Sequence, residues 1–183
     1  MSNGFACFPN SVVNAIIAWN VYFVIFSPTD LKEDDDIDIG HYGIIIDPFG
    51  ETTDSNHPIG LLVHLIIPDM NFNKIVDVQC IRYSPKIEDS RIIKSTNIGK
   101  FKLPSKFNIA SSSAVSISFW AHSRFHSFVL NHGLEWNEIT NCHSFTKYLL
   151  EGMKFDVSQY SFGKDDYLPW EIDMEKFYKN VKV

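Results

Sequence analysis

A cysteine at the start of a predicted helix is the residue of this sequence best placed to do nucleophilic chemistry. Cys142 follows Asn141, a residue type that often caps a helix N-terminus. Apolar residues then recur at Phe145, Tyr148 and Leu149, the i, i+3, i+4 spacing of a half-buried helical face. The pattern therefore predicts that Cys142 occupies the first turn of a short helix, which Gly152 is expected to end.

The first turn of a helix favours a reactive thiol. Backbone N–H groups without intrahelical partners, together with the positive end of the helix dipole, stabilise a thiolate and can also bind an oxyanion. Cys142 is therefore a candidate nucleophile, with Asn141 and the Cys142 N–H as the candidate helix cap and oxyanion site. The alternative is a small buried residue, which is the usual role of a cysteine at a helix start. A base is also required, and a histidine distant in the sequence could supply it.

Seven histidines could supply that base, and His41 is the best placed. It lies near the start of a predicted strand over 39–47, where a rigid scaffold could direct its ring at a helix N-terminus. His122 and His126, at i and i+4, could bind zinc, but a third ligand and the glutamate of the protease motif are missing nearby. His132 and His143 flank Cys142 without a second cysteine, so we expect no metal and no cofactor.

Composition indicates one compact domain over residues 1–183. A chain of 183 residues with 45% hydrophobic content can build one core but is short for two domains. The formal net charge of -6 argues against general nucleic-acid binding, which usually requires a basic surface. The acidic run over 32–38 lacks the glycine turn and the alternating ligands of a calcium loop, so we expect it to be a solvated loop.

The cysteines and the apolar runs indicate a reducing, cytoplasmic location. The three cysteines include no C-x-x-C pair, which argues against a disulfide framework or a four-cysteine zinc site. The apolar run over 12–26 is interrupted by two asparagines and is shorter than a bilayer span, and no basic residue precedes it as in a secretory signal. Contact with a membrane surface stays open.

The order of predicted elements indicates an α+β fold, with an antiparallel β-sheet of about four to six strands packed against the cysteine-bearing helix. Residues rich in β-branched and aromatic side chains predict strands over 20–26, 39–47, 60–68 and 74–83, with Cys80 as a small core residue. Residues 84–98 are predicted to be a loop, followed by a short edge strand over 99–103. Helices are predicted over 108–130, ending by Gly133, and over 171–180.

Two of these segments together resemble a known group of enzymes. The sequence GHYGII over 40–45, followed by NCHSF over 141–145, resembles the circularly permuted papain-like hydrolases of the NlpC/P60 superfamily, in which the histidine strand precedes the cysteine helix. In the PPPDE thiol isopeptidase branch, an early strand, a histidine-led strand and N-C-x-x-F follow one another, and 21–27, 41–46 and 141–145 look like that series.

The lecithin:retinol acyltransferase-like branch offers a second resemblance. Its H-W-x-x-x-V and V-H-L-x-P strands are similar to 41–46 and 63–68, although the two histidines are further apart here and His143-Ser144 replaces its Glu-His pair. A family of small proteins of unclear activity, with G-H-x-G-I and N-C-H-S motifs, is also similar. The motifs therefore do not by themselves establish an enzyme.

The resemblance implies a permuted papain-like domain with Cys142 as nucleophile and His41 as its base. In the acyltransferase-like reading His64 orients His41, whereas in the isopeptidase reading a Cys–His dyad suffices and His64 is a strand histidine. We expect a cysteine hydrolase acting on a protein or peptide substrate as a thiol protease or isopeptidase. The alternatives are a lipid acyltransferase or phospholipase acting on an acyl lipid, and a catalytically silent interaction domain.

Overall fold

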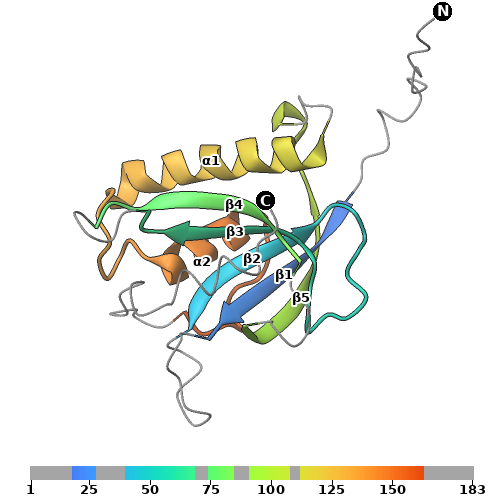
Figure 1. The fold of residues 1–183 in the computed structure, drawn as a ribbon. Helices are drawn as coiled ribbons and strands as arrows, with labels where there is room; N and C mark the ends of the chain where they lie inside the picture. The colour runs from blue at the N-terminus through green and yellow to red at the C-terminus, as the bar shows by residue number, and fades with distance from the viewer. Residues whose placement is uncertain (1–17, 28–39, 69–73, 85–90, 108–111, 163–183) are drawn as a thin grey trace, which may run out of the picture.

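The computed structural model describes residues 18–27, 40–68, 74–84, 91–107 and 112–162, and within them it forms an α+β fold (Figure 1). This confirms the predicted class. In chain order the elements are β1 (Ala18–Phe26), β2 (His41–Asp47), β3 (Gly60–Ile66), β4 (Asp77–Tyr83), β5 (Ile92–Lys102), a 3₁₀ turn η4 (Ser105–Phe107), α1 (Ser113–His132) and α2 (Cys142–Gly152).

The five strands form one antiparallel sheet in the order β4-β3-β2-β1-β5. Strands β1 to β4 are a meander in which each strand pairs with the next, and β5 returns to pair with the other side of β1. β2 and β3 therefore lie inside the sheet, and every one of their residues is buried. This explains their nearly continuous apolar sequences, because strands buried on both faces need no polar alternation.

Strand β5 corrects the prediction of a loop over 84–98, because the strand begins at Ile92 and runs for 11 residues. Its pairing with β1 shifts register between Val21 and Tyr22, where Gly99 has φ of +127°. Such a bulge interrupts the alternation of side chains, and most residues of β5 are exposed or half-buried. The polar first half of this edge strand is therefore held by backbone pairing with β1, which a single-sequence pattern does not reveal.

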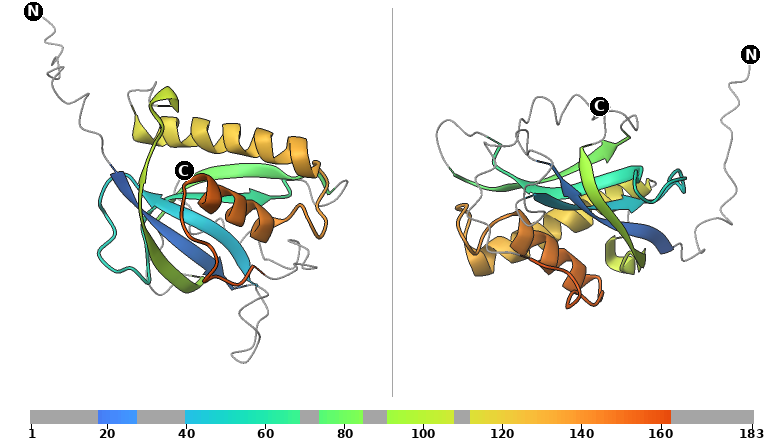
Figure 2. Two further views of the ribbon diagram at one scale, coloured as in Figure 1. Left: turned by 180° about the vertical axis from the view of Figure 1, so that it is seen from behind. Right: turned by 90° about the horizontal axis from the view of Figure 1, so that it is seen from below.

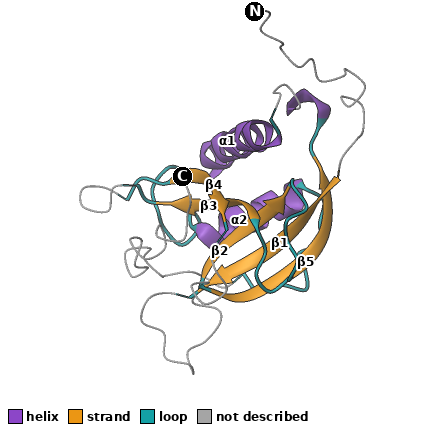
Figure 3. Ribbon diagram, turned by 45° about the vertical axis from the view of Figure 1, so that its right-hand side comes forward, coloured by secondary structure: helices purple, strands orange, loops and turns teal. Residues whose placement is uncertain are grey.

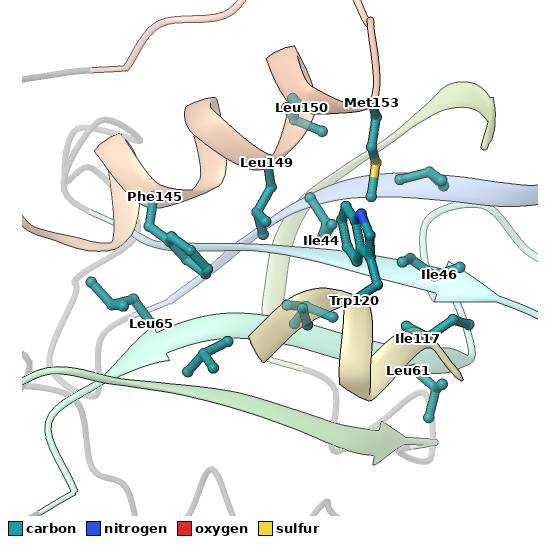
Figure 4. Close-up of a cluster of buried hydrophobic side chains, with 14 of the residues drawn as sticks. Ile44, Ile46, Leu61, Leu65, Ile117, Trp120, Phe145, Leu149, Leu150 and Met153 are labelled. Carbon is teal, nitrogen blue, oxygen red and sulfur yellow. The ribbon is translucent and has the colours of Figure 1, made fainter. Parts of the chain in front are cut away.

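Both helices pack on the same face of the sheet (Figures 2 and 3). α1 packs against β4, while α2 packs against β2 and β3. The apolar side chains between the layers come from both helices and from the central strands (Figure 4). Those labelled in the figure are Ile44, Ile46, Leu61, Leu65, Ile117, Trp120, Phe145, Leu149, Leu150 and Met153. Burial of this surface, at roughly 25 cal/mol per Å², holds α2 and its N-terminus against the sheet.

The opposite face of the sheet carries a second, smaller apolar cluster. Alternate residues of β1, β2, β3 and β4 contribute to it, and its buried members are Tyr22, Val24, Phe26, Ile45, Leu62 and Tyr83. Because successive side chains of a strand point to opposite faces, each central strand supplies both clusters.

The helix boundaries largely follow the predicted signals. α1 ends at Gly133, whose φ is +88° and whose N–H donates to the Val129 carbonyl at 2.8 Å. α2 begins at Cys142 as predicted, but it includes Gly152, and the positive φ that follows the helix belongs to Lys154 at +67°.

Neither helix of the described part of the chain is long and apolar enough to cross a membrane. The predictions for residues 32–38 and 171–180 lie outside the described residues.

Gly60 leads to the first prediction, because a side chain at this position would collide with the neighbouring strand. A Cβ there would lie 2.3 Å from the carbonyl oxygen of Ile46. We expect Gly60→Ala to lower the free energy of unfolding by about 1–3 kcal/mol, the usual range for overpacking, as measured by urea denaturation. Gly50→Asn is the control, because Gly50 has open space around it and its φ of +66° suits asparagine. Equal stability of the two variants would contradict this account of Gly60.

Candidate active site

His143 joins the N-terminus of α2 to the start of β2. Its Nε2 donates a hydrogen bond to the Gly40 carbonyl at 2.8 Å, and its ring stacks on Tyr42 with centroids 3.6 Å apart and an interplanar angle of 24°. Cys142 and His41 are the chain neighbours of these bonded residues. The contact therefore brings the predicted nucleophile and the predicted base to the same end of the sheet.

Cys142 is the first residue of α2, and only 2% of its surface is exposed. Asn141 caps the helix: its Oδ1 accepts the Ser144 N–H at 2.9 Å, and Ser144 Oγ accepts the Asn141 N–H at 3.1 Å. The sequence pattern identified the cap but missed Ser144 as its reciprocal partner.

The side-chain amide of Asn141 also fastens the loop before the helix. Its Nδ2 donates to the carbonyls of Asn137 at 3.2 Å and Glu138 at 3.1 Å. With both ends of the amide bonded to backbone, Asn141 fits a helix cap better than an oxyanion donor. The predicted oxyanion role therefore falls to the N–H of Cys142.

His41 and His64 form a buried hydrogen-bonded pair that continues to a third residue, Gln79. His41 Nε2 lies 2.6 Å from His64 Nδ1, and His64 Nε2 lies 2.8 Å from Gln79 Oε1. His41 is 4% exposed and His64 is fully buried. We call these three residues the His–His–Gln chain.

The strand register explains why the three side chains meet. His64 on β3 is directly opposite Gly43 of β2 on one side and Gln79 of β4 on the other. His41 precedes Gly43 by two residues, so it shares a face with His64 and lies diagonal to it. A Cβ on Gly43 would be 3.2 Å from His64 Cβ and 3.0 Å from Leu62 Cδ1. Glycine at this position therefore leaves room for the imidazole pair.

Strand alternation decides how the His–His–Gln chain can approach the helix. His41 and Tyr42 are successive residues of β2, so their side chains point to opposite faces, and the Tyr42 ring is the one that meets His143 of α2. The ring of Phe26, a member of the opposite cluster, lies 6.2 Å from that of His41. Any contact between Cys142 and His41 must therefore form around the end of β2, where α2 begins.

Burial keeps both histidines of the pair neutral. Loss of hydration lowers the pKa of His41 well below its ordinary value, and the nearby His64 and His143 add to this effect. Burial also lowers the pKa of His64 to about 4, although the hydrogen bond to Gln79 opposes the shift. An uncharged imidazole at neutral pH is the form that can accept a proton.

The remaining candidate residues occupy ordinary structural positions. His122 and His126 are exposed on α1, and His122 Nδ1 bonds to the Ser118 carbonyl at 2.8 Å. His132 stacks on Phe128 with ring centroids 4.3 Å apart. Burial raises the pKa of Cys80 to about 12, which keeps it a protonated thiol. Among the described residues, no three histidines, cysteines or carboxylates are grouped so that they could hold a metal ion.

Gln79 is the member of the site that sequence reasoning missed. The residue is half-buried on an outer strand and carries no catalytic motif. Only the pairing of β3 with β4 places it opposite His64.

Comparison with known proteins found no matching family model, no matching curated protein and no matching solved structure.

Buried neutral histidines predict that acid destabilises the protein. Because the folded pKa of His64 is about 4 and the unfolded value is about 6.5, the unfolded chain binds more protons between these values. The free energy of unfolding should therefore fall as the pH falls from 6.5 to 4, by up to about 1.4 kcal/mol per pH unit for each such histidine. Urea denaturation across this range measures the slope.

Two histidine variants test whether His64 causes this pH dependence of the free energy of unfolding. His64→Gln removes one titrating group and should give a shallower pH dependence of unfolding, whereas His126→Gln changes an exposed histidine and should leave the slope unchanged. The interpretation is wrong if His64→Gln retains the full slope.

Proposed function

We propose that this protein is a cysteine hydrolase in which Cys142 is the nucleophile and His41 is the general base. The observation that carries the proposal is the 2.8 Å hydrogen bond from His143 to Gly40, because it joins the helix turn bearing Cys142 to the strand start bearing His41. The hydrogen bond from His41 to His64 adds support, since a base needs a partner that orients its ring.

The proposed reaction is acyl transfer through a thioester. Since Nε2 of His41 is engaged with His64, Nδ1 is the nitrogen that takes the proton from Cys142 Sγ. The sulfur attacks the carbonyl carbon of the substrate, and the Cys142 N–H helps to hold the oxyanion. His41 then returns the proton to the leaving amine or alcohol, and water attacks the thioester with His41 again as base.

The electrostatics favour proton transfer during attack over a preformed ion pair. Burial and two neighbouring histidines disfavour the imidazolium form of His41. The imidazole of His41 is therefore uncharged at rest, and in the proposed reaction it takes the thiol proton as the carbon–sulfur bond forms. A thiol activated in this way can attack the carbonyl of an amide, ester or thioester.

Replacement of the nucleophile tests the proposal. Cys142→Ala should abolish labelling by a thiol-reactive acyl probe and reduce hydrolysis of peptide and isopeptide substrates to the uncatalysed rate, as followed by mass spectrometry. Cys80→Ala is the control and should keep both, because Cys80 is a half-buried thiol on β4 whose pKa desolvation raises to about 12. Unchanged labelling in Cys142→Ala would refute the assignment, and a wild-type protein without labelling at Cys142 would favour a catalytically silent interaction domain.

A lipid substrate is the second candidate, and exposed apolar side chains near α2 favour it. Ile139, three residues before Cys142, is 56% exposed, and Leu134 in the same loop is 48% exposed. Glu135 of this loop pairs with Ile75, which lies before β4 and is also exposed. Leu130, near the end of α1, is a further exposed apolar residue close to the loop in sequence. The participation of His64 in a hydrogen-bonded chain also agrees with the acyltransferase-like resemblance.

Polar substitution of the loop separates the two substrate classes. For a lipid substrate, Leu134→Ser combined with Ile139→Ser should lower hydrolysis of a vesicle-borne phospholipid at least about fivefold and leave hydrolysis of a short soluble ester unchanged, because only the first requires insertion of apolar side chains. Ile93→Ser combined with Val115→Ser is the control, since these exposed residues lie on β5 and at the start of α1. Equal loss in both double variants would contradict a lipid-docking loop.

A further inference from the structure

We infer that Gln79 is a positioning residue that fixes the protonation pattern of both histidines, so that the acceptor lone pair of His41 resides on Nδ1. This inference rests on the proposed function, in which His41 Nδ1 takes the proton from Cys142. The geometry that carries it is the continuous chain from His41 Nε2 to His64 Nδ1 and from His64 Nε2 to Gln79 Oε1.

The chemistry of an amide sets the direction of the chain. With the Gln79 amide oriented so that Oε1 faces His64, the oxygen accepts the hydrogen bond and His64 carries its proton on Nε2. A neutral imidazole has one N–H, and therefore His64 Nδ1 is an acceptor. His41 must then donate from Nε2, which leaves Nδ1 as the basic nitrogen of His41.

The same chain limits where the proton can travel. When His41 accepts a proton at Nδ1, it becomes an imidazolium whose Nε2–H still donates to His64. His64 cannot pass its own proton further, because a glutamine carbonyl is too weak a base to accept it. The charge therefore stays on His41, where the proton can be returned to the leaving group.

Strand pairing makes this arrangement rigid. His64 and Gln79 are directly opposite each other in the antiparallel pairing of β3 with β4, and His64 is fully buried. A side chain in this position needs no loop movement to keep its hydrogen bond. Gln79 thus acts on the reaction through His64 and His41 without touching the substrate.

The experiment measures the tautomer of each histidine directly and then measures kinetics. Long-range ¹H–¹⁵N correlation NMR of the full-length wild-type protein with ¹⁵N-labelled histidine, at neutral pH, should show the proton on Nε2 of both His41 and His64. In Gln79→Leu, signal should move to Nδ1–H forms, and kcat for acyl hydrolysis should fall at least about tenfold with KM changed less than threefold. Gln159→Leu, at an exposed glutamine, should change neither measurement.

Gln79→Glu provides a second variant with a readout that a purely structural role would not affect. A carboxylate is also an acceptor, so both histidines should keep Nε2–H. Its negative charge should raise the basicity of His41 and move the acid limb of the kcat/KM profile to higher pH. A proton on Nδ1 of His64 in the wild-type protein would overturn the inference. If both histidines carry the proton on Nε2 but the protein shows no acyl hydrolysis, the tautomer assignment is supported and the proposed enzyme activity is rejected.

Discussion

The hydrogen bond between His143 and the Gly40 carbonyl is the contact on which the geometry of the candidate site depends. It connects residues 103 positions apart in the sequence. His143 lies in the first turn of α2, and Gly40 immediately precedes β2. The His143 ring also stacks on the Tyr42 ring. The two contacts together fix the position of the α2 N-terminus relative to β2. The apolar face of α2 supplies the attraction to the sheet, but apolar packing has no direction of its own. A directional contact at the helix start decides which end of the sheet the thiol occupies.

The sheet contributes a different constraint, because it places polar groups inside an apolar interior. Buried polar groups cost free energy unless they are hydrogen-bonded, and both ring nitrogens of the fully buried His64 have partners, one in His41 and one in Gln79. Gly43 makes their approach possible, since any larger residue would press on Leu62 and His64. The polar chain and its glycine thus form a single packing unit, in which replacing one member disturbs the others.

The sequence indicated the elements whose signals are local. The apolar runs of β2 and β3 and the asparagine before Cys142 each identify an element within a few residues of its observed bounds, because burial and capping leave a pattern at adjacent positions. Other features depend on pairing between distant strands and leave no such pattern. The polar first half of β5 predicts a loop, and no local pattern marks Gln79, because each owes its position to a neighbouring strand. The family resemblance indicates His64 as a site residue, but its contact with His41 follows only from the register of β2 against β3.

The order of the strands along the chain has a consequence for how the site assembles. The contacts within the His–His–Gln chain span only 23 and 15 residues and belong to one meander, whereas the contact that places α2 closes a loop of 103 residues. Short loops close with less entropic cost, and during synthesis the meander leaves the ribosome first. The imidazole pair can therefore be complete while the segment bearing Cys142 is still unattached. In a nascent chain, the buried contacts among His41, His64 and Gln79 therefore precede the docking of α2 on the sheet.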